Sequence, residues 1–152
     1  MIRAFRTSAA VLAAIALAGP ALAESHASNP AQDARNSHMN LYGFNLGVLG
    51  AMAKGDTEFD ATIAQEHAAN LVALSGMSEH GYWVEGTASG ELADSRALPA
   101  IWENMDDFMA KSQALHEAAM AIDASSLEGV QAGVGQLGGA CGACHKVYRQ
   151  PE

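Results

Sequence analysis

The sequence predicts an all-α protein folded as an antiparallel four-helix bundle. Three observations lead to this fold class. Four stretches repeat apolar residues at three- and four-residue steps, one long and two short connections separate them, and the alternation typical of strands is scarce. Short connections place neighbouring helices antiparallel, which is the arrangement of a four-helix bundle.

The first 23 residues have the pattern of a secretory signal peptide. Arg3 and Arg6 precede an apolar run at residues 9–18, and Ala21-Leu22-Ala23 offers a small-x-small cleavage site. We therefore expect residues 1–23 to be removed and residues 24–152 to fold as a single domain. Later apolar stretches fall short of the roughly 18 residues that a membrane-spanning helix needs. The chain is expected to be exported, in a bacterium to the periplasm.

The first predicted helix runs from Asn29 to about residue 53, and the second from about residue 60 to 76. Asn29 is a favourable N-cap, Pro30 suits the first turn, and Gly55 suits a helix C-terminus. Apolar residues recur at helical steps in both segments: Leu41, Phe44, Val48 and Met52 in the first, and Ile63, Leu71 and Leu74 in the second.

Residues 78–95 hold three glycines and no sustained period, so they are predicted to form a long surface loop. The third predicted helix follows from about Leu98 to Met120. The fourth starts at Ser125, which has capping-box spacing to Glu128. Their apolar positions are Ile101, Trp102, Met105, Phe108, Met109, Leu115 and Met120, then Leu127, Val130, Val134, Leu137, Cys141 and Cys144.

Acidic residues dominate the charge. Removal of the signal leaves six Lys and Arg against 17 Asp and Glu, about 11 net negative charges. Such a surface repels phosphates, so nucleic acid is not an expected partner. A redox protein with a basic docking patch is the expected kind of partner, since opposite charges speed encounter. We find no catalytic acid–base pair among the carboxylates and do not predict an enzyme.

The chain closes on Cys141-Gly-Ala-Cys144-His145, a Cys-x-x-Cys-His motif. This is the attachment sequence of c-type haem. A helical offset of three residues places both thiols on one side of a porphyrin, where they can add to its two vinyl groups. The next residue, His145, can then reach the iron as the proximal ligand. The motif predicts one covalent haem c near the C-terminal helix.

Two haem-free alternatives stay open: a zinc site and a redox dithiol. A closed zinc site needs four ligands, and the chain has no second cysteine pair. The remaining histidines are expected to be solvated surface residues: His26, His38, His67, His80 and His116. A redox Cys-x-x-Cys usually opens a helix after a strand, and it gives His145 no role.

Six glycines crowd the last predicted helix: Gly129, Gly133, Gly135, Gly138, Gly139 and Gly142. Each costs roughly 1 kcal/mol of helix propensity relative to Ala. Close approach of a flat macrocycle to the helix could justify that cost, and an irregular C-terminal helix is the alternative.

With these features, residues 31–150 resemble the class II cytochromes c, the cytochrome c-prime family. The match includes the closing motif with Tyr148 and Arg149 after it, Arg35, "AKGDTEFDA" at Ala53 to Ala61 and "RALPAIWENMDDF" at Arg96 to Phe108. The resemblance implies thioether bonds to Cys141 and Cys144, and His145 as fifth iron ligand. It also implies Arg149 near the proximal face and Arg35 near a haem propionate.

The resemblance further implies that Met39 lies at the sixth coordination position of the iron. A methionine there either ligates the iron, giving a low-spin electron carrier, or only blocks the site. Ligation is the favoured interpretation. The expected function is periplasmic single-electron transfer. A five-coordinate haem that binds nitric oxide or carbon monoxide is the alternative. Family members often pair through their first two helices, so a homodimer is possible.

Overall fold

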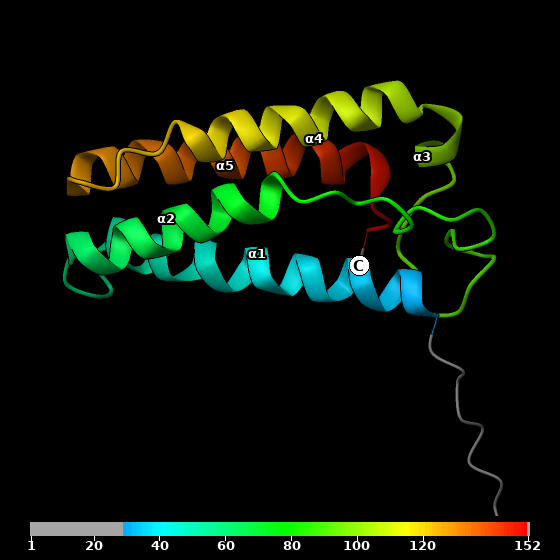
Figure 1. Cartoon of the computed structure of the whole chain (residues 1–152), viewed down its shortest axis with the longest axis horizontal. Helices are drawn as coiled ribbons and strands as arrows, with labels where there is room; N and C mark the ends of the chain where they lie inside the picture. Colours follow the sequence, from blue (N-terminus) through cyan, green and yellow to red (C-terminus); the bar gives the residue numbers. More distant parts are fainter. Residues whose placement is uncertain (1–28, 152) are drawn as a thin grey trace, which may run out of the picture.

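The computed structural model describes residues 29–151, and these residues form an all-α four-helix bundle, as predicted (Figure 1). Its helices are α1 (Pro30–Lys54), α2 (Ala61–Ser75), α3 (Ala100–Glu103), α4 (Met105–Met120) and α5 (Leu127–Tyr148). Around the bundle, α1 packs against α2 and α5, and α4 packs against the same two helices. None of these helices is long and apolar enough to cross a membrane. The predicted signal peptide, residues 1–23, lies outside the described residues.

The ends of α1 follow from local chemistry. Asn29 has an extended backbone, and its side-chain oxygen accepts hydrogen bonds from the N–H groups of Ala31 and Gln32. At the other end Gly55 adopts the left-handed conformation with φ of 80°, which glycine tolerates without strain. The predicted start and end of this helix are therefore confirmed.

The third predicted helix is interrupted. Asn104, with φ of −135° and ψ of 49°, separates the short α3 from α4. The start of α5 also differs by one residue from the prediction. Ser126 is the N-cap and accepts a hydrogen bond from the Gly129 N–H at 3.1 Å, whereas Ser125 is hydrogen-bonded to Asp123. Ser and Asp compete for the same turn here, and a capping pattern in sequence does not decide between them.

Two of the α5 glycines have a packing reason that differs from the predicted one. A Cβ on Gly129 would lie 2.7 Å from Asp123 Cβ, and one on Gly133 would lie 2.9 Å from Ile122 Cγ1. These glycines let α5 approach the turn that follows α4. In contrast, a Cβ on Gly135, Gly138, Gly139 or Gly142 would meet nothing within 4 Å. The helix is continuous to Tyr148, so it is not irregular.

The buried face of α1 matches the predicted apolar face only in part, since Met52 is buried and Val48 packs against the core. Leu41 and Phe44 are 50% and 65% exposed, and Ile63 of α2 is also exposed. Besides Met52, the buried positions of α1 are Arg35, His38, Asn45 and Leu49. Two separate cores result. One contains Leu49, Leu71, Val130 and Leu137, and the other contains Ile101, Phe108 and Tyr148.

The long connection between α2 and α3 is confirmed as a loop without regular elements. It lies at the end of the bundle that also holds the start of α1 and the end of α5 (Figure 1). Backbone bonds tie it to the C-terminus: Leu98 N–H donates to the Tyr148 carbonyl at 2.9 Å, and Gln150 N–H donates to the Arg96 carbonyl at 2.8 Å. The loop and the end of α5 thus form one surface at this end.

Candidate haem site

The Cys-x-x-Cys-His motif occupies the last turns of α5, with its two thiols directed toward different neighbours. Cys141 lies close enough to Tyr42 of α1 to influence its ionisation, while Cys144 is influenced by Lys111 and Asp107 of α4. Both cysteines are partly buried, and they are not joined by a disulfide. Cys144 also packs against the core that contains Ile101, Phe108 and Tyr148.

The protonation of these groups suits haem binding better than thiol redox chemistry. Burial raises the pKa of the Cys141 thiol, and burial is also the main cause of the raised pKa of Cys144. Reactive dithiols have lowered pKa values, so these thiols lack the activation of a redox pair. Burial, followed by the charges of Arg149 and Arg96, lowers the pKa of His145. The neutral imidazole is the form that binds a metal.

An aromatic cluster packs beside Cys144. Phe108 contacts Trp83 edge-on at 4.6 Å and Tyr148 at 5.4 Å between ring centroids. The Tyr148 hydroxyl donates to Asp107 Oδ2 at 2.5 Å, and this hydrogen bond is the main reason that its pKa rises to about 12. These contacts anchor the end of α5 to α4 immediately after the motif.

Arg35 has a role in the structure that the sequence did not reveal. Its guanidinium, only 5% exposed, donates to the Tyr82 carbonyl at 2.6 Å and to Thr87 Oγ1 at 2.9 Å, and it lies 5.1 Å from the Trp83 ring centroid. Burial lowers its pKa. Arg35 therefore fastens the long loop to α1. The propionate contact implied by the resemblance stays a prediction.

Helical spacing predicts that Met39 lies on the side of α1 that faces α5. Successive helical residues are about 100° apart, so Met39 shares a face with Tyr42 and Ala53. Tyr42 lies near Cys141, and the Ala53 carbonyl accepts a hydrogen bond from Gln131 of α5 at 2.9 Å. Similarly, His145 follows Cys141 by about one turn and shares its side of α5. Met39, which is 39% exposed, and His145 are therefore expected to border the same gap between the two helices.

His38 does not fit its prediction as a surface residue, because it is only 3% exposed. Its Nε2 lies 3.0 Å from the Leu74 carbonyl of α2, which can only accept, so Nε2 carries the hydrogen. Nδ1 has no hydrogen-bond partner and lies 3.7 Å from Glu79 Oε1. The sequence did not predict this burial, because the apolar pattern of a single helix does not show which of its polar residues will face a neighbouring helix.

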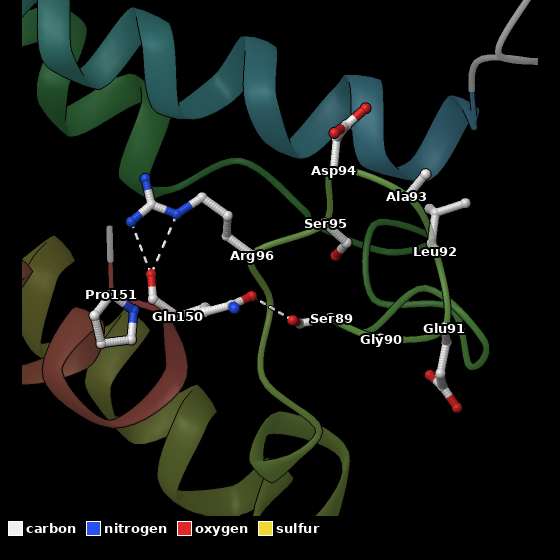
Figure 2. Close-up of a pocket in the computed structure, with 10 residues that line it drawn as sticks. All are labelled: Ser89, Gly90, Glu91, Leu92, Ala93, Asp94, Ser95, Arg96, Gln150 and Pro151. Atoms are coloured by element: carbon white, nitrogen blue, oxygen red, sulfur yellow. Dashed lines mark hydrogen bonds between the residues drawn. The ribbon is translucent and has the colours of Figure 1, made fainter.

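The exposed Arg149 begins the segment that follows α5. Figure 2 shows the next residues, where the Arg96 guanidinium donates to the Gln150 carbonyl and Ser89 is hydrogen-bonded to the Gln150 side chain. A hollow of about 730 Å³ opens beside this contact, lined by residues 89–96, Gln150 and Pro151. This hollow is open to solvent, and none of the three motif residues lines it. It is therefore separate from the haem site.

The residues around the motif fit a covalent haem. They provide two free thiols at the required spacing, a neutral imidazole next to them, and a thioether on the facing helix. Within residues 29–151, no group of three or more His, Cys, Asp or Glu side chains is arranged to hold a metal ion. Fold and site together define a class of protein, the c-type cytochromes built on a four-helix bundle.

Comparison with known proteins gives the family. Residues 30–149 match the family described as Cytochrome C'. Cytochrome c-554 of Cereibacter sphaeroides is 42% identical over 123 residues, covering 79% of this chain and 80% of the relative. The solved cytochrome c' from Rhodobacter spheriodes is 34% identical with a TM-score of 0.78, covering 80% of this chain and 96% of that one. A nitric oxide complex of a mutant cytochrome c prime from Alcaligenes xylosoxidans is 27% identical, with a TM-score of 0.69 and coverage of 80% and 94%.

The chain belongs to the cytochrome c' family. Its members bind one covalent haem c through a C-terminal Cys-x-x-Cys-His motif and are not enzymes, so the predicted family and cofactor are confirmed. This also removes the zinc and dithiol alternatives. The roles of individual residues stay predictions.

Proposed function

We propose that this protein is a periplasmic single-electron carrier in which Met39 ligates the haem iron. In this proposal Cys141 and Cys144 hold the haem by thioether bonds and His145 is the fifth ligand. The haem supplies a redox centre that cycles between ferric and ferrous iron. The proposal is supported by the contacts of Tyr42 and Ala53 with α5, because helical spacing puts Met39 on the same side of α1 as these residues.

The second candidate is a protein that binds nitric oxide or carbon monoxide. It is favoured by the partial exposure of Met39, because a side chain that is not fixed in the core can move aside. The relative crystallised with nitric oxide supports the same possibility. In this case Met39 would be an apolar plug, and an arriving ligand would displace it.

Optical spectra of the purified protein, with and without carbon monoxide, separate the two functions. If Met39 ligates the iron, the ferric protein is low-spin and has the weak near-infrared band of methionine–iron ligation. Met39→Ala then removes the band, lowers the reduction potential and opens the iron to carbon monoxide. If Met39 is a plug, the wild type is high-spin and the substitution only speeds ligand entry. A wild type that is low-spin and stays so in Met39→Ala would contradict both proposals.

Export and partner choice belong to the same proposal. Residues 1–23 direct the chain to the periplasm, where its family works, and fractionation of cells that express the full chain checks this. With 17 acidic residues, the molecule favours a redox partner that has a basic docking patch.

We also propose that two copies pair through α1 and α2. Members of the family form dimers. Large apolar side chains are exposed on these two helices, namely Leu41, Phe44 and Ile63, and Phe44 packs against the His67 ring at 5.6 Å. A second copy would bury them. Sedimentation equilibrium should then show a dimer for the wild type and a monomer for Phe44→Asp, since burying a carboxylate there is costly. A monomeric wild type would contradict the pairing.

A further inference from the structure

We propose that His38 is a positioning residue that sets the rotation of α1 and thereby holds Met39 toward α5. The inference rests on the proposed place of Met39 at the sixth coordination position. It concerns a different contact, on the side of α1 that faces α2. The observation behind it is a buried polar side chain, next to Met39 in sequence, that is tied to a neighbouring helix.

The contact joins His38 to the end of α2. The His38 Nε2–H donates to the Leu74 carbonyl at 3.0 Å, in the last turn of that helix. Carbonyl groups in a last turn lack partners within their own helix. The Leu74 carbonyl also accepts from the Met77 N–H at 3.1 Å, so it keeps one partner when His38 is replaced. A variant at position 38 therefore loses one bond without stranding a buried acceptor.

The same imidazole also reaches toward the haem side of α1. Its ring stacks on Tyr42 with centroids 4.7 Å apart and planes 15° apart, and it meets Tyr82 of the loop edge-on at 5.8 Å. Tyr42 in turn lies near Cys141. His38 thus bridges the end of α2 and the aromatic ring that adjoins the haem-binding helix.

This bridge fixes the rotation of α1 about its own axis. Met39 follows His38 by about 100° around the helix, so fixing His38 against α2 directs Met39 toward α5. A second fixed point lies two turns further, where Asn45 Oδ1 accepts from His67 Nδ1 at 2.8 Å and from Asn70 Nδ2 at 3.0 Å. The apolar neighbours cannot fix the rotation as firmly, since hydrophobic contact is not directional.

The experiment is a double-mutant cycle on the holoprotein, read by the rate of carbon monoxide association with the ferrous form. This rate reports how well position 39 guards the iron, whether Met39 is a ligand or a plug. Met39→Ala is expected to raise it by about tenfold or more. His38→Asn, whose amide is too short to reach Leu74, is expected to raise it about fivefold, the equivalent of one hydrogen bond.

The combination of the two substitutions gives the decisive result. Because His38 acts through Met39, His38→Asn/Met39→Ala should be no faster than Met39→Ala alone. His38→Gln places its amide nitrogen where Nε2 lies and should retain the wild-type rate. His67→Leu removes one α1–α2 bond at the second fixed point, which the bond from Asn70 to Asn45 still holds, so it should also retain that rate.

Each contrary outcome points to a different failure. Wild-type kinetics in His38→Asn, or rates that multiply in the double variant, would overturn the positioning role while leaving Met39 in place. A fast His67→Leu would show that any loss of bundle stability opens the iron. A fast His38→Gln would overturn the role of the hydrogen bond, even if His38→Asn did not fold. If Met39→Ala itself has the wild-type rate, the proposed place of Met39 fails and the inference falls with it.

Discussion

At the scale of single residues, the site is prepared by the neighbours of the motif as much as by the motif itself. Burial keeps both thiols protonated, and burial together with Arg149 and Arg96 keeps His145 neutral. Spacing in the sequence identifies the three motif residues, since their chemistry depends only on local geometry. The hydrogen bond from Tyr148 to Asp107 joins α5 to α4, and no local sequence pattern predicts such a contact.

The Tyr148–Asp107 bond predicts a stability change at alkaline pH. The hydrogen bond to Asp107 is the main cause that raises the pKa of Tyr148 from its ordinary value of 10.0 to about 12 in the folded protein. Between these values the unfolded chain loses a proton that the folded protein keeps, so rising pH favours unfolding. The Tyr148→Phe variant has no hydroxyl at this position, so it cannot show this pH-dependent loss of stability.

Guanidinium unfolding of both holoproteins, followed by circular dichroism at pH 7 and above pH 10, measures the effect. The wild type should be the more stable at pH 7, and its advantage should shrink as pH rises. The raised pKa of Tyr42 affects both proteins alike and cancels in the comparison. An advantage that grows with pH would show that the hydroxyl is not held in this bond.

At the scale of elements, both ends of α1 were predictable, whereas its buried face was predictable only in part. Asn29, Pro30 and Gly55 act on their own backbone, so their positions in sequence locate the ends of α1. The inward face of α1 depends on α2, which is hydrogen-bonded to His38 and Asn45, and on α5, whose Gln131 donates to the Ala53 carbonyl. The apolar period therefore predicted the position of the helix correctly. It also predicted Leu41 and Phe44 to be in the core, whereas both are exposed.

The α5 glycines offer a prediction about packing. Gly129→Ala should destabilise the protein by about 1–3 kcal/mol, the usual cost of forcing an atom into a filled space. Here the new Cβ would meet Asp123, whose Cβ is 2.7 Å away. Gly138→Ala should stabilise the same helix by up to about 1 kcal/mol, since alanine has the better helix propensity.

Thermal unfolding of the two holoprotein variants beside the wild type measures both effects. The haem spectrum of Gly138→Ala is the control, since no residue within 4 Å of the new Cβ explains a change. A shifted spectrum together with lost stability would indicate that the macrocycle itself lies against this glycine. Equal losses in both variants would contradict the packing account of Gly129.

At the scale of the whole molecule, the charge is uneven. The protein is strongly acidic, yet Arg96, Lys146 and Arg149 gather near His145 at the end of α5. Lys54 lies at the other end of the bundle, where α1 ends (Figure 1). Net charge sets the long-range attraction of a partner, whereas charge beside the site acts at contact distance. These two effects have opposite signs here.

Oxidation of the ferrous protein by small complexes of opposite charge separates the two effects. A cationic cobalt complex should react faster at low ionic strength and slow as salt is added, because the overall charge is negative. Anionic ferricyanide should show the reverse. Arg149→Gln and Lys54→Gln remove the same charge, but only Arg149 lies near His145. Arg149→Gln should therefore increase the preference for the cation more than Lys54→Gln does, by about twofold or more for a charge a few ångströms from the site. Equal changes in the two variants would mean that electrons leave the protein at a surface remote from Arg149.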